Sequence, residues 1–177
     1  MSNRSLPILL VEDNPMDIEL TLRAFKKHKI SNPITVARDG EEALDYIHRR
    51  GRFAHDAPVP ALILLDIRLP KLDGIDVLRE IKAHPVYRTV PVVILTTSEN
   101  EVDIQNCYTL GANSFILKPV EFNAFFELTG RIELYWLLTN VPPLAATRTS
   151  AQTPAPRMPQ GSDVQAGEPD PPEDHVA

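Results

Sequence analysis

Leu62-Ile63-Leu64-Leu65-Asp66 is the stretch that decides the fold, because four apolar residues in a row end at a carboxylate. Three other apolar runs also lead directly to a reactive polar side chain: residues 8–11 before Glu12 and Asp13, residues 92–95 before Thr96, and residues 115–117 before Lys118. Short continuous apolar runs are typical of strands in a parallel sheet covered on both faces. The carboxyl ends of such strands line the ligand crevice of an open α/β sheet. The sequence therefore predicts that three carboxylates, one hydroxyl and one ammonium converge on a single site.

Strand-like and helix-like segments alternate five times along the chain. The expected strands are residues 8–11, 34–37, 61–66, 90–96 and 115–117, and the expected helices follow Asn14-Pro15, Asp39-Gly40 and Gly74 and span about 100–110 and 121–138. The helix at 100–110 has the weakest pattern. This alternation predicts an α/β fold, a doubly wound (βα)5 three-layer sandwich of the flavodoxin-like type. Its five-stranded parallel sheet would have the strand order 2-1-3-4-5.

Composition narrows the class of protein. Hydrophobic residues make up 43% of the 177 residues and charged residues 24%, as in ordinary globular domains. The net charge of −6, with no basic block, disfavours nucleic acid as the main partner. No apolar run approaches the length of a membrane span, and no signal-peptide pattern precedes the first strand. Because Cys107 is the one cysteine, no intramolecular disulfide can form, so we expect a cytoplasmic protein.

The last 36 residues differ in composition from the rest. Eight of the 17 prolines lie in residues 142–177, which contain no aromatic residue and carry two arginines against five acids. Such a segment buries too little apolar surface to offset the entropy of ordering. We therefore expect a folded domain over residues 1–141 and a proline-rich, acidic, disordered tail over 142–177. Composition favours a dispensable extension over a functional tail.

The expected cluster suits a divalent metal and a phosphoryl group. Magnesium favours one or two carboxylates together with phosphate oxygens, and Glu12, Asp13 and Asp66 supply the carboxylates. An aspartate can also act as a nucleophile and form an aspartyl-phosphate. Thr96 and Lys118 would then hold the remaining phosphoryl oxygens.

Each of these residues also has an ordinary structural interpretation. Asp13 could cap the next helix, Thr96 could be a turn residue, and Lys118 could be a solvated surface charge. Asp66 is harder to explain as a cap, because Pro70 and Gly74 follow several residues later. Their joint occurrence at four of five strand ends favours a functional site.

These motifs, in this order, resemble the receiver domain of two-component response regulators. The resemblance covers about residues 6–138 and rests on Glu12-Asp13-Asn14-Pro15, Asp66-Ile67-Arg68-Leu69-Pro70 with Asp73-Gly74, Leu95-Thr96-Thr97-Ser98, and Lys118-Pro119. It implies that Asp66 accepts a phosphoryl group from a histidine kinase. It also implies Mg²⁺ or Mn²⁺ bound by Glu12, Asp13, Asp66 and the backbone carbonyl of Arg68.

The same resemblance assigns the switch. It implies that Thr96 bonds the phosphoryl group, that Lys118 anchors it, and that Phe115 is the aromatic switch residue. It also implies a cis bond between Lys118 and Pro119. Phosphorylation would then shift the population between two conformations of the face formed by the fourth helix, the fifth strand and the final helix.

A narrower resemblance comes from the long connection at residues 49–60 and from residues 133–137. Both are similar to single-domain regulators paired with bacterial and cyanobacterial phytochromes, which implies a phytochrome-type sensor kinase as partner. Five apolar residues of the final helix can face the core, namely Phe122, Phe125, Phe126, Ile132 and Trp136. Leu128, Tyr135 and Leu138 add apolar surface elsewhere on that helix. This pattern indicates either unusual burial of the helix or a protein interface. We favour a symmetric homodimer through the final helix and the face that it forms with the fourth helix and the fifth strand.

Arg68 and Ser98 depart from the common family pattern, two residues beyond the phospho-acceptor and the switch threonine. Arg68 could screen the aspartyl-phosphate or pair with an acid, which predicts slow self-dephosphorylation; a solvated surface charge is the alternative. An aspartyl-phosphate hydrolase would need an Asp where Arg68 stands, so we expect a switch that catalyses only its own phosphotransfer and dephosphorylation. The sequence contains neither G-x-G-x-x-G nor G-x-x-x-x-G-K-[ST], which disfavours a nucleotide- or flavin-binding α/β domain. We also do not expect a DNA-binding regulator, because the residues after 138 are proline-rich and acidic and leave no room for a helix-turn-helix.

Overall fold

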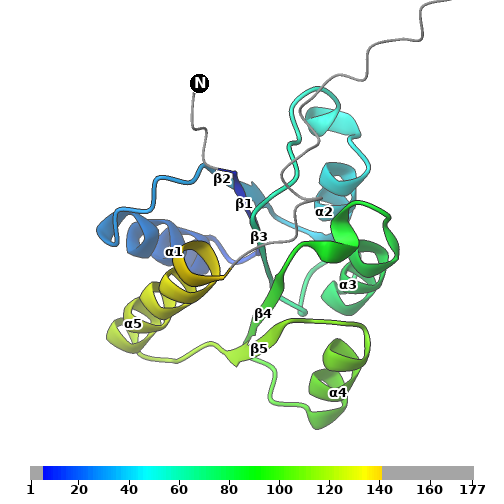
Figure 1. The fold of residues 1–177 in the computed structure, drawn as a ribbon. Coiled ribbons are helices and arrows are strands. Elements are labelled where there is room, and N and C mark those ends of the chain that lie inside the picture. Colours follow the sequence, from blue (N-terminus) through cyan, green and yellow to red (C-terminus); the bar gives the residue numbers. More distant parts are fainter. Residues whose placement is uncertain (1–5, 141–177) are drawn as a thin grey trace, which may run out of the picture.

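The computed structural model describes residues 6–140, which form a parallel sheet of five strands covered by helices on both faces (Figure 1). The strands are β1 (Ile8–Val11), β2 (Ile34–Ala37), β3 (Leu62–Leu65), β4 (Val92–Thr96) and β5 (Ser114–Leu117). The helices are α1 (Pro15–Lys27), α2 (Gly40–Ile47), α3 (Gly74–Ala83), α4 (Glu101–Thr109) and α5 (Phe122–Glu133), with short 3-10 turns at Gly51–Phe53 and Tyr87–Thr89. A π-helical segment, Leu134–Thr139, continues α5.

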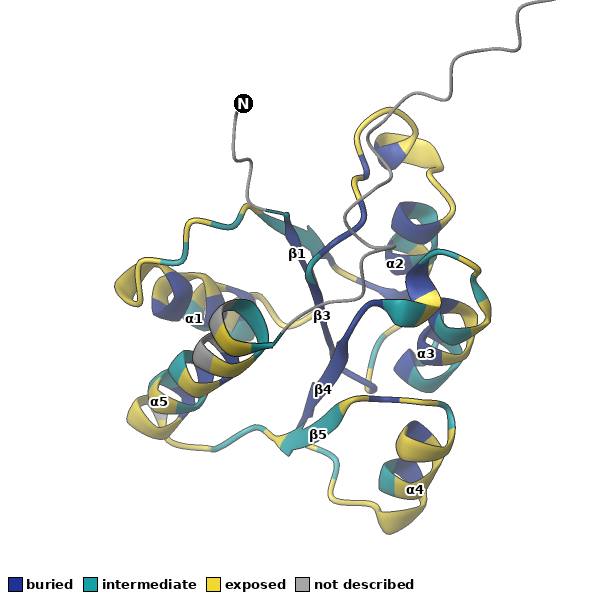
Figure 2. Ribbon diagram, in the orientation of Figure 1, coloured by how far each residue is buried: buried dark blue, intermediate teal, exposed yellow. Residues whose placement is uncertain are grey.

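The order of the strands is β2-β1-β3-β4-β5, and each neighbouring pair is parallel. The predicted fold and strand order are therefore confirmed. Every residue of β1, β3 and β4 is buried, whereas most residues of the edge strands β2 and β5 are partly exposed (Figure 2). This difference explains why the apolar runs at the centre of the sheet are continuous.

Two hydrophobic cores lie on opposite faces of the sheet. Alternate residues of the central strands, such as Leu9, Ile63 and Ile94, face α2, α3 and α4. Their sequence neighbours, such as Ile8 and Leu62, face α1 and α5. Side chains of a strand point alternately to the two faces, so one four-residue run contributes to both cores.

Polar caps fix where four of the helices begin. The side chains of Asn14, Asp39, Asp73 and Asn100 each accept a hydrogen bond from a backbone N–H in the first turn of α1, α2, α3 and α4 respectively. These caps satisfy donors that the first turn leaves unpaired. They also hold the amino ends of the helices close to the carboxyl ends of the strands.

Three expectations about the chain's connections differ from the structure. The peptide bond between Lys118 and Pro119 is trans, not cis; an X–Pro bond prefers trans by about 0.5–1 kcal/mol unless its surroundings select the other isomer. The predicted final helix is α-helical only to Glu133 and then continues as the π-helical segment. Leu128 packs against the core shared by α1 and α5, because the helix turns it inward rather than to a separate surface.

Some expectations lie outside the described residues. They include the disordered tail over 142–177 and the boundary at 141, together with the side-chain placement of Phe122 and Leu138. Within residues 6–140, no helix is long and apolar enough to cross a membrane.

Candidate functional site

The centre of the site is the ammonium group of Lys118, which follows β5 directly. Its Nζ atom lies 2.5 Å from Oε2 of Glu12, 2.6 Å from Oδ2 of Asp66 and 2.9 Å from Oδ2 of Asp17. The side chains of Lys118, Glu12 and Asp66 are almost completely buried. The site therefore joins the ends of β1, β3 and β5 through one cation, as the positions of these residues at strand ends predicted.

Three carboxylates surround one ammonium, so negative charge is in excess. Burial raises the pKa of Glu12 to about 7, and the repulsion of Asp66 adds to this, although Lys118 opposes both effects. The same carboxylates raise the pKa of Lys118, which stays protonated despite its burial. The site therefore favours an added positive charge, whether a proton or a metal ion.

Asp66 is held by both of its carboxylate oxygens. Its Oδ1 atom accepts a hydrogen bond of 3.0 Å from the backbone N–H of Arg68, while Oδ2 faces Lys118. Its carboxylate thus lies in a fixed orientation at the end of β3.

Thr96, the last residue of β4, is fully buried. Its hydroxyl accepts a hydrogen bond of 3.3 Å from the backbone N–H of Ser98, and its carbonyl accepts one of 2.8 Å from the backbone N–H of Lys118. Thr96 therefore links the loop after β4 to the residue that carries the cation. Phe115, in β5, is partly buried and packs against the core that lies between the sheet and α2, α3 and α4.

Asp13 lies apart from this ion-pair cluster. It is exposed, whereas its neighbour Glu12 is buried and accepts a hydrogen bond of 3.1 Å from the backbone N–H of Asn14. Among residues 6–140, no group of three or more histidine, cysteine or acidic side chains is arranged to hold a metal ion by itself. The predicted set of Glu12, Asp13 and Asp66 is thus not preassembled, because Lys118 lies between two of its members.

Arg68 pairs with an acid, which was one of the two expectations for it. Its guanidinium donates to Oδ2 of Asp103 at 2.5 Å and to Oγ of Ser98 at 3.2 Å. Ser98 in turn donates to the same oxygen of Asp103 at 2.9 Å. Asp103 is buried in the first turn of α4, so this network joins the loop after β3 to α4.

The sequence analysis did not identify Asp17 or Asp103. Both are acids in the first turn of a helix, where a carboxylate is common for reasons of helix stability alone. A usable signal was available for Asp17, because a helix that starts at Pro15 places it directly beyond the acidic pair.

Gly74 allows the loop after β3 to approach α3. A Cβ atom at this position would lie 2.2 Å from the carbonyl oxygen of Asp66 and 2.5 Å from the Cα of Ile67. The Gly74 N–H also donates to the carbonyl of Ile67 at 2.9 Å. Only glycine permits this contact, which fixes the backbone that carries Asp66.

This fold and site belong to a chain that matches the model of a known protein family. Residues 8–129 match the response regulator receiver domain. The chain belongs to this family. The match includes every strand, α1 to α4 and most of α5, so the receiver domain accounts for the fold.

Three relatives resemble this receiver domain over most of its length. Response regulator Rcp1 of Synechocystis sp. is 40% identical over 148 residues, which are 82% of this chain and the whole of Rcp1. A structure of Rcp1 in its Mn²⁺-bound form has a TM-score of 0.74, covering 78% of this chain and 99% of that one at 39% identity.

The other two relatives are response regulators of phytochrome systems. The phosphorylated cyanobacterial phytochrome response regulator RcpA has a TM-score of 0.75 at 41% identity, covering 78% of this chain and 99% of that one. The bacteriophytochrome response regulator AtBRR has a TM-score of 0.61 at 49% identity, covering 77% and 99% respectively. This receiver domain is therefore related to phytochrome response regulators.

Proposed function

We propose that the protein is a stand-alone response regulator that accepts a phosphoryl group on Asp66 from a phytochrome-type histidine kinase. The observation that carries this proposal is the position of Asp66 at the end of β3, with one carboxylate oxygen 2.6 Å from the ammonium of Lys118. This chain covers the whole of response regulator Rcp1, which supports the stand-alone form. It covers nearly the whole of the phytochrome response regulators RcpA and AtBRR, which supports the partner as well.

The chemistry needs little beyond positioning and charge neutralisation. A carboxylate is already ionised at neutral pH, so Asp66 can attack a phosphoryl group without a general base. The backbone N–H of Arg68 holds Oδ1 and orients the carboxylate. Lys118 would then pair with the phosphoryl oxygens as a compact positive charge. Its ammonium could shift toward them while it keeps its hydrogen bonds to Glu12 and Asp17.

A divalent metal fits the donor set on chemical grounds. Glu12, Asp13, Asp66 and the backbone carbonyl of Arg68 offer hard oxygen ligands. Burial, with a smaller contribution from the charge of Asp66, raises the pKa of Glu12, so a cation that replaces the lost hydration would favour its ionised form. When bound, Mg²⁺ or Mn²⁺ would neutralise the phosphoryl oxygens and the carboxylates together. Rcp1, whose structure was determined with Mn²⁺, supports this assignment.

Phosphorylation would be read out through β4 and β5. A phosphoryl group adds charge and acceptor oxygens beside Thr96, whose hydroxyl accepts a hydrogen bond of 3.3 Å from the backbone N–H of Ser98. A shift of Thr96 toward that group would change the space available to Phe115 and so the face formed by α4, β5 and α5.

That face is also the proposed dimer interface. Large apolar side chains are exposed on α4, on β5 and on the π-helical segment that continues α5, namely Val102, Tyr108, Leu117 and Tyr135. Exposed apolar groups gathered in a patch mark protein interfaces. A symmetric homodimer would cover them, and the balance between monomer and dimer would be the output that phosphorylation controls.

The assignment of Asp66 is tested by phosphorylation with acetyl phosphate and Mg²⁺. We expect Asp66→Asn to abolish incorporation of the phosphoryl label. Asp76→Asn is the matched control, because Asp76 is an exposed acid on α3 that pairs with Arg79. Label incorporated by Asp66→Asn at the normal rate would show that another residue is the acceptor.

The partner and the output need separate measurements. Phosphotransfer from a bacteriophytochrome kinase at a rate that depends on red or far-red light would support the pairing, and transfer only from unrelated kinases would oppose it. Light scattering with and without beryllofluoride, a phosphoryl mimic, should show a change in mass. An unchanged mass would contradict the dimer as the output.

A further inference from the structure

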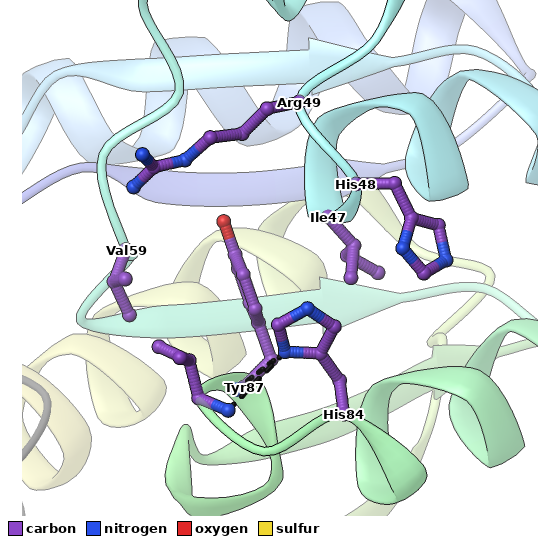
Figure 3. Close-up of a pocket in the computed structure, with 7 residues that line it drawn as sticks. Ile47, His48, Arg49, Val59, His84 and Tyr87 are labelled. Carbon is purple, nitrogen blue, oxygen red and sulfur yellow. Dashed lines mark hydrogen bonds between the residues drawn. The ribbon is translucent and has the colours of Figure 1, made fainter.

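A cavity of about 310 Å³ opens at the amino ends of the strands, the end of the sheet opposite Asp66. It lies between the carboxyl ends of α2 and α3 and the segments that enter β3 and β4 (Figure 3). Its lining combines an apolar wall with four polar side chains: Ile47, Val59 and Val86 form the wall, and His48, Arg49, His84 and Tyr87 supply the polar groups. None of these residues belongs to the phosphorylation site.

The hydroxyl of Tyr87 is a buried donor without an acceptor. Tyr87 is 2% exposed, and no described residue accepts a hydrogen bond from its hydroxyl, although the guanidinium of Arg49 lies close enough to act as a donor toward its oxygen. The other tyrosine of this core, Tyr46, donates to the carbonyl of Pro58 at 2.6 Å. A buried hydroxyl proton without an acceptor destabilises the fold, because water would otherwise have bonded it, so the position of Tyr87 needs an explanation.

Arg49 lies over this hydroxyl and also lacks an anionic partner. Figure 3 shows the Tyr87 hydroxyl directed toward the guanidinium of Arg49. A guanidinium has no acceptor atom, so it cannot receive the hydroxyl proton. Arg50 and Arg52 pair with Asp45 and Glu42, whereas Arg49 forms no ion pair among the residues that the structure describes.

The backbone of Arg49 is held in an unfavourable conformation. Its φ of 52° lies in the left-handed region, which residues other than glycine, asparagine and aspartate rarely adopt. This conformation directs the arginine across the cavity rather than away from it (Figure 3). The same conformation ends α2, because the Arg50 N–H then donates to the carbonyl of Asp45 at 2.8 Å, and Lys29 ends α1 in the same way.

The histidines add another donor. Nδ1 of His84 accepts hydrogen bonds from the backbone N–H groups of Val86 and Tyr87 at 3.2 and 3.3 Å. Burial and the neighbouring His48 lower the pKa of His84, so its ring is neutral and carries its proton on Nε2. The two imidazole rings are 5.8 Å apart and form one side of the cavity.

We propose that this cavity binds a small organic carboxylate with an apolar body. Its carboxylate would accept the hydrogen bond that Tyr87 cannot make within the protein and would pair with Arg49. Its apolar part would contact Ile47, Val59 and Val86. Arg49 is exposed, so its side chain can move by the width of a carboxylate to admit the ligand between the guanidinium and the hydroxyl.

The lining selects this class of ligand over others. A metal ion would find no carboxylate among the seven lining residues, and a cation would be repelled by Arg49. The apolar wall would leave a free phosphate with unpaired oxygens. A cavity of this size with an apolar wall and a few convergent donors is typical of sites for small molecules.

Titration of the full-length, unphosphorylated protein with benzoate tests this proposal without using Asp66 or a metal. We expect saturable shifts of the backbone amide NMR signals around Arg49 and Tyr87. Benzamide has the same shape without the charge and should bind at least about tenfold more weakly, because hydrogen bonds to a charged group are stronger than those to a neutral one. The absence of saturable shifts, or equal binding of benzamide, would overturn the proposal.

Three variants locate the site. Tyr87→Phe and Arg49→Gln should each weaken benzoate binding by about tenfold or more. Arg88→Gln is the matched control, because this exposed arginine is a neighbour of Tyr87 that does not line the cavity. Tyr87→Phe removes only an unpaired hydroxyl, so it should fold as the unchanged protein does. If both cavity variants bind benzoate normally, or if Arg88→Gln weakens it equally, the cavity is not the site.

Discussion

Lys118 and Asp66 are 52 residues apart in the chain, yet the Nζ atom of one lies 2.6 Å from the Oδ2 atom of the other. Their side chains are only 5% and 7% exposed, so water screens the pair weakly. The ammonium therefore already lies where the charge of an incoming phosphoryl group would accumulate. We therefore expect the stability of the fold and the proposed phosphotransfer to depend on the same cation.

Removing that cation should impair both properties. In Lys118→Met, Glu12 and Asp66 lose their buried counter-charge, and breaking such a pair costs about 3–5 kcal/mol. We expect a lower midpoint in urea and little label from acetyl phosphate. Lys71→Met is the control, because Lys71 pairs with Asp39 and Glu41 at an exposed position. Equal stability of the two variants would contradict a central role of Lys118.

The pKa of Glu12 predicts how stability depends on pH. In the fold this pKa rises from 4.5 to about 7, so the folded state retains the proton more strongly than the unfolded chain. Without metal, Glu12 makes its full contribution to the free energy of unfolding below about pH 4.5. This contribution is lost as the pH rises through 7, and the loss amounts to at most about 3 kcal/mol. Urea unfolding in EDTA at several pH values should show this decline, and Glu12→Gln should flatten it. Glu19→Gln, an exposed carboxylate paired with Arg23, should leave the decline unchanged.

Metal binding should show the opposite dependence on pH. A proton on Glu12 competes with Mg²⁺, so the apparent affinity should fall about tenfold per unit below pH 7. Titrations followed by the fluorescence of Trp136 or by calorimetry would measure it. An affinity independent of pH between about 6 and 8 would exclude Glu12 as a ligand.

The contact of Arg68 with Asp103 predicts the lifetime of the phosphorylated state. Arg68→Asn removes the side chain beside Asp66 and its tie to α4, so we expect the aspartyl-phosphate to hydrolyse several times faster. Asp103→Asn breaks the ion pair but keeps the arginine, and it separates the effect of the tie from that of the side chain. A phosphate-release time course that is faster in the unchanged protein than in Arg68→Asn would refute this prediction.

Gly74 predicts a steric effect on the site. In Gly74→Ala the added Cβ would overlap the carbonyl of Asp66, so we expect a loss of stability of about 2–4 kcal/mol and slower phosphorylation of the folded fraction. Gly111→Ala is the control, because it strains a positive φ of 97° at a position where the nearest atoms belong to Lys82. If Gly74→Ala were phosphorylated at the normal rate, the approach of α3 would not position Asp66.

Much of the fold was predictable because its signals are local in the sequence. The buried strands are uninterrupted apolar runs, and caps such as Asn14 and Asp39 mark where helices begin. The grouping of Glu12, Asp66 and Lys118 followed from one rule about the ends of parallel strands. Their chemical roles remain predictions.

The features that escaped prediction depend on side-chain conformation and on packing between distant segments. In the sequence, Asp17 and Asp103 are ordinary acids in the first turn of a helix. Only the structure shows that Lys118 pairs with Asp17 and Arg68 with Asp103. The cavity beside Tyr87 arises where α2, α3 and two loops meet, and no motif marks it. The trans bond at Lys118 depends on a balance of about 1 kcal/mol, which a resemblance does not determine.

The sequence distance between the charges of the site has a consequence for the order of folding. Lys118 is separated from Glu12 by 106 residues and from Asp66 by 52, so these contacts close only when the last strand docks on the edge of the sheet. Contacts between residues so far apart in the sequence form late in folding, because a long loop must close before they stabilise the chain. A chain still emerging from the ribosome before residue 118 would hold its acids without their counter-charge. Competence for phosphorylation would therefore arise in one step, when the sheet is complete.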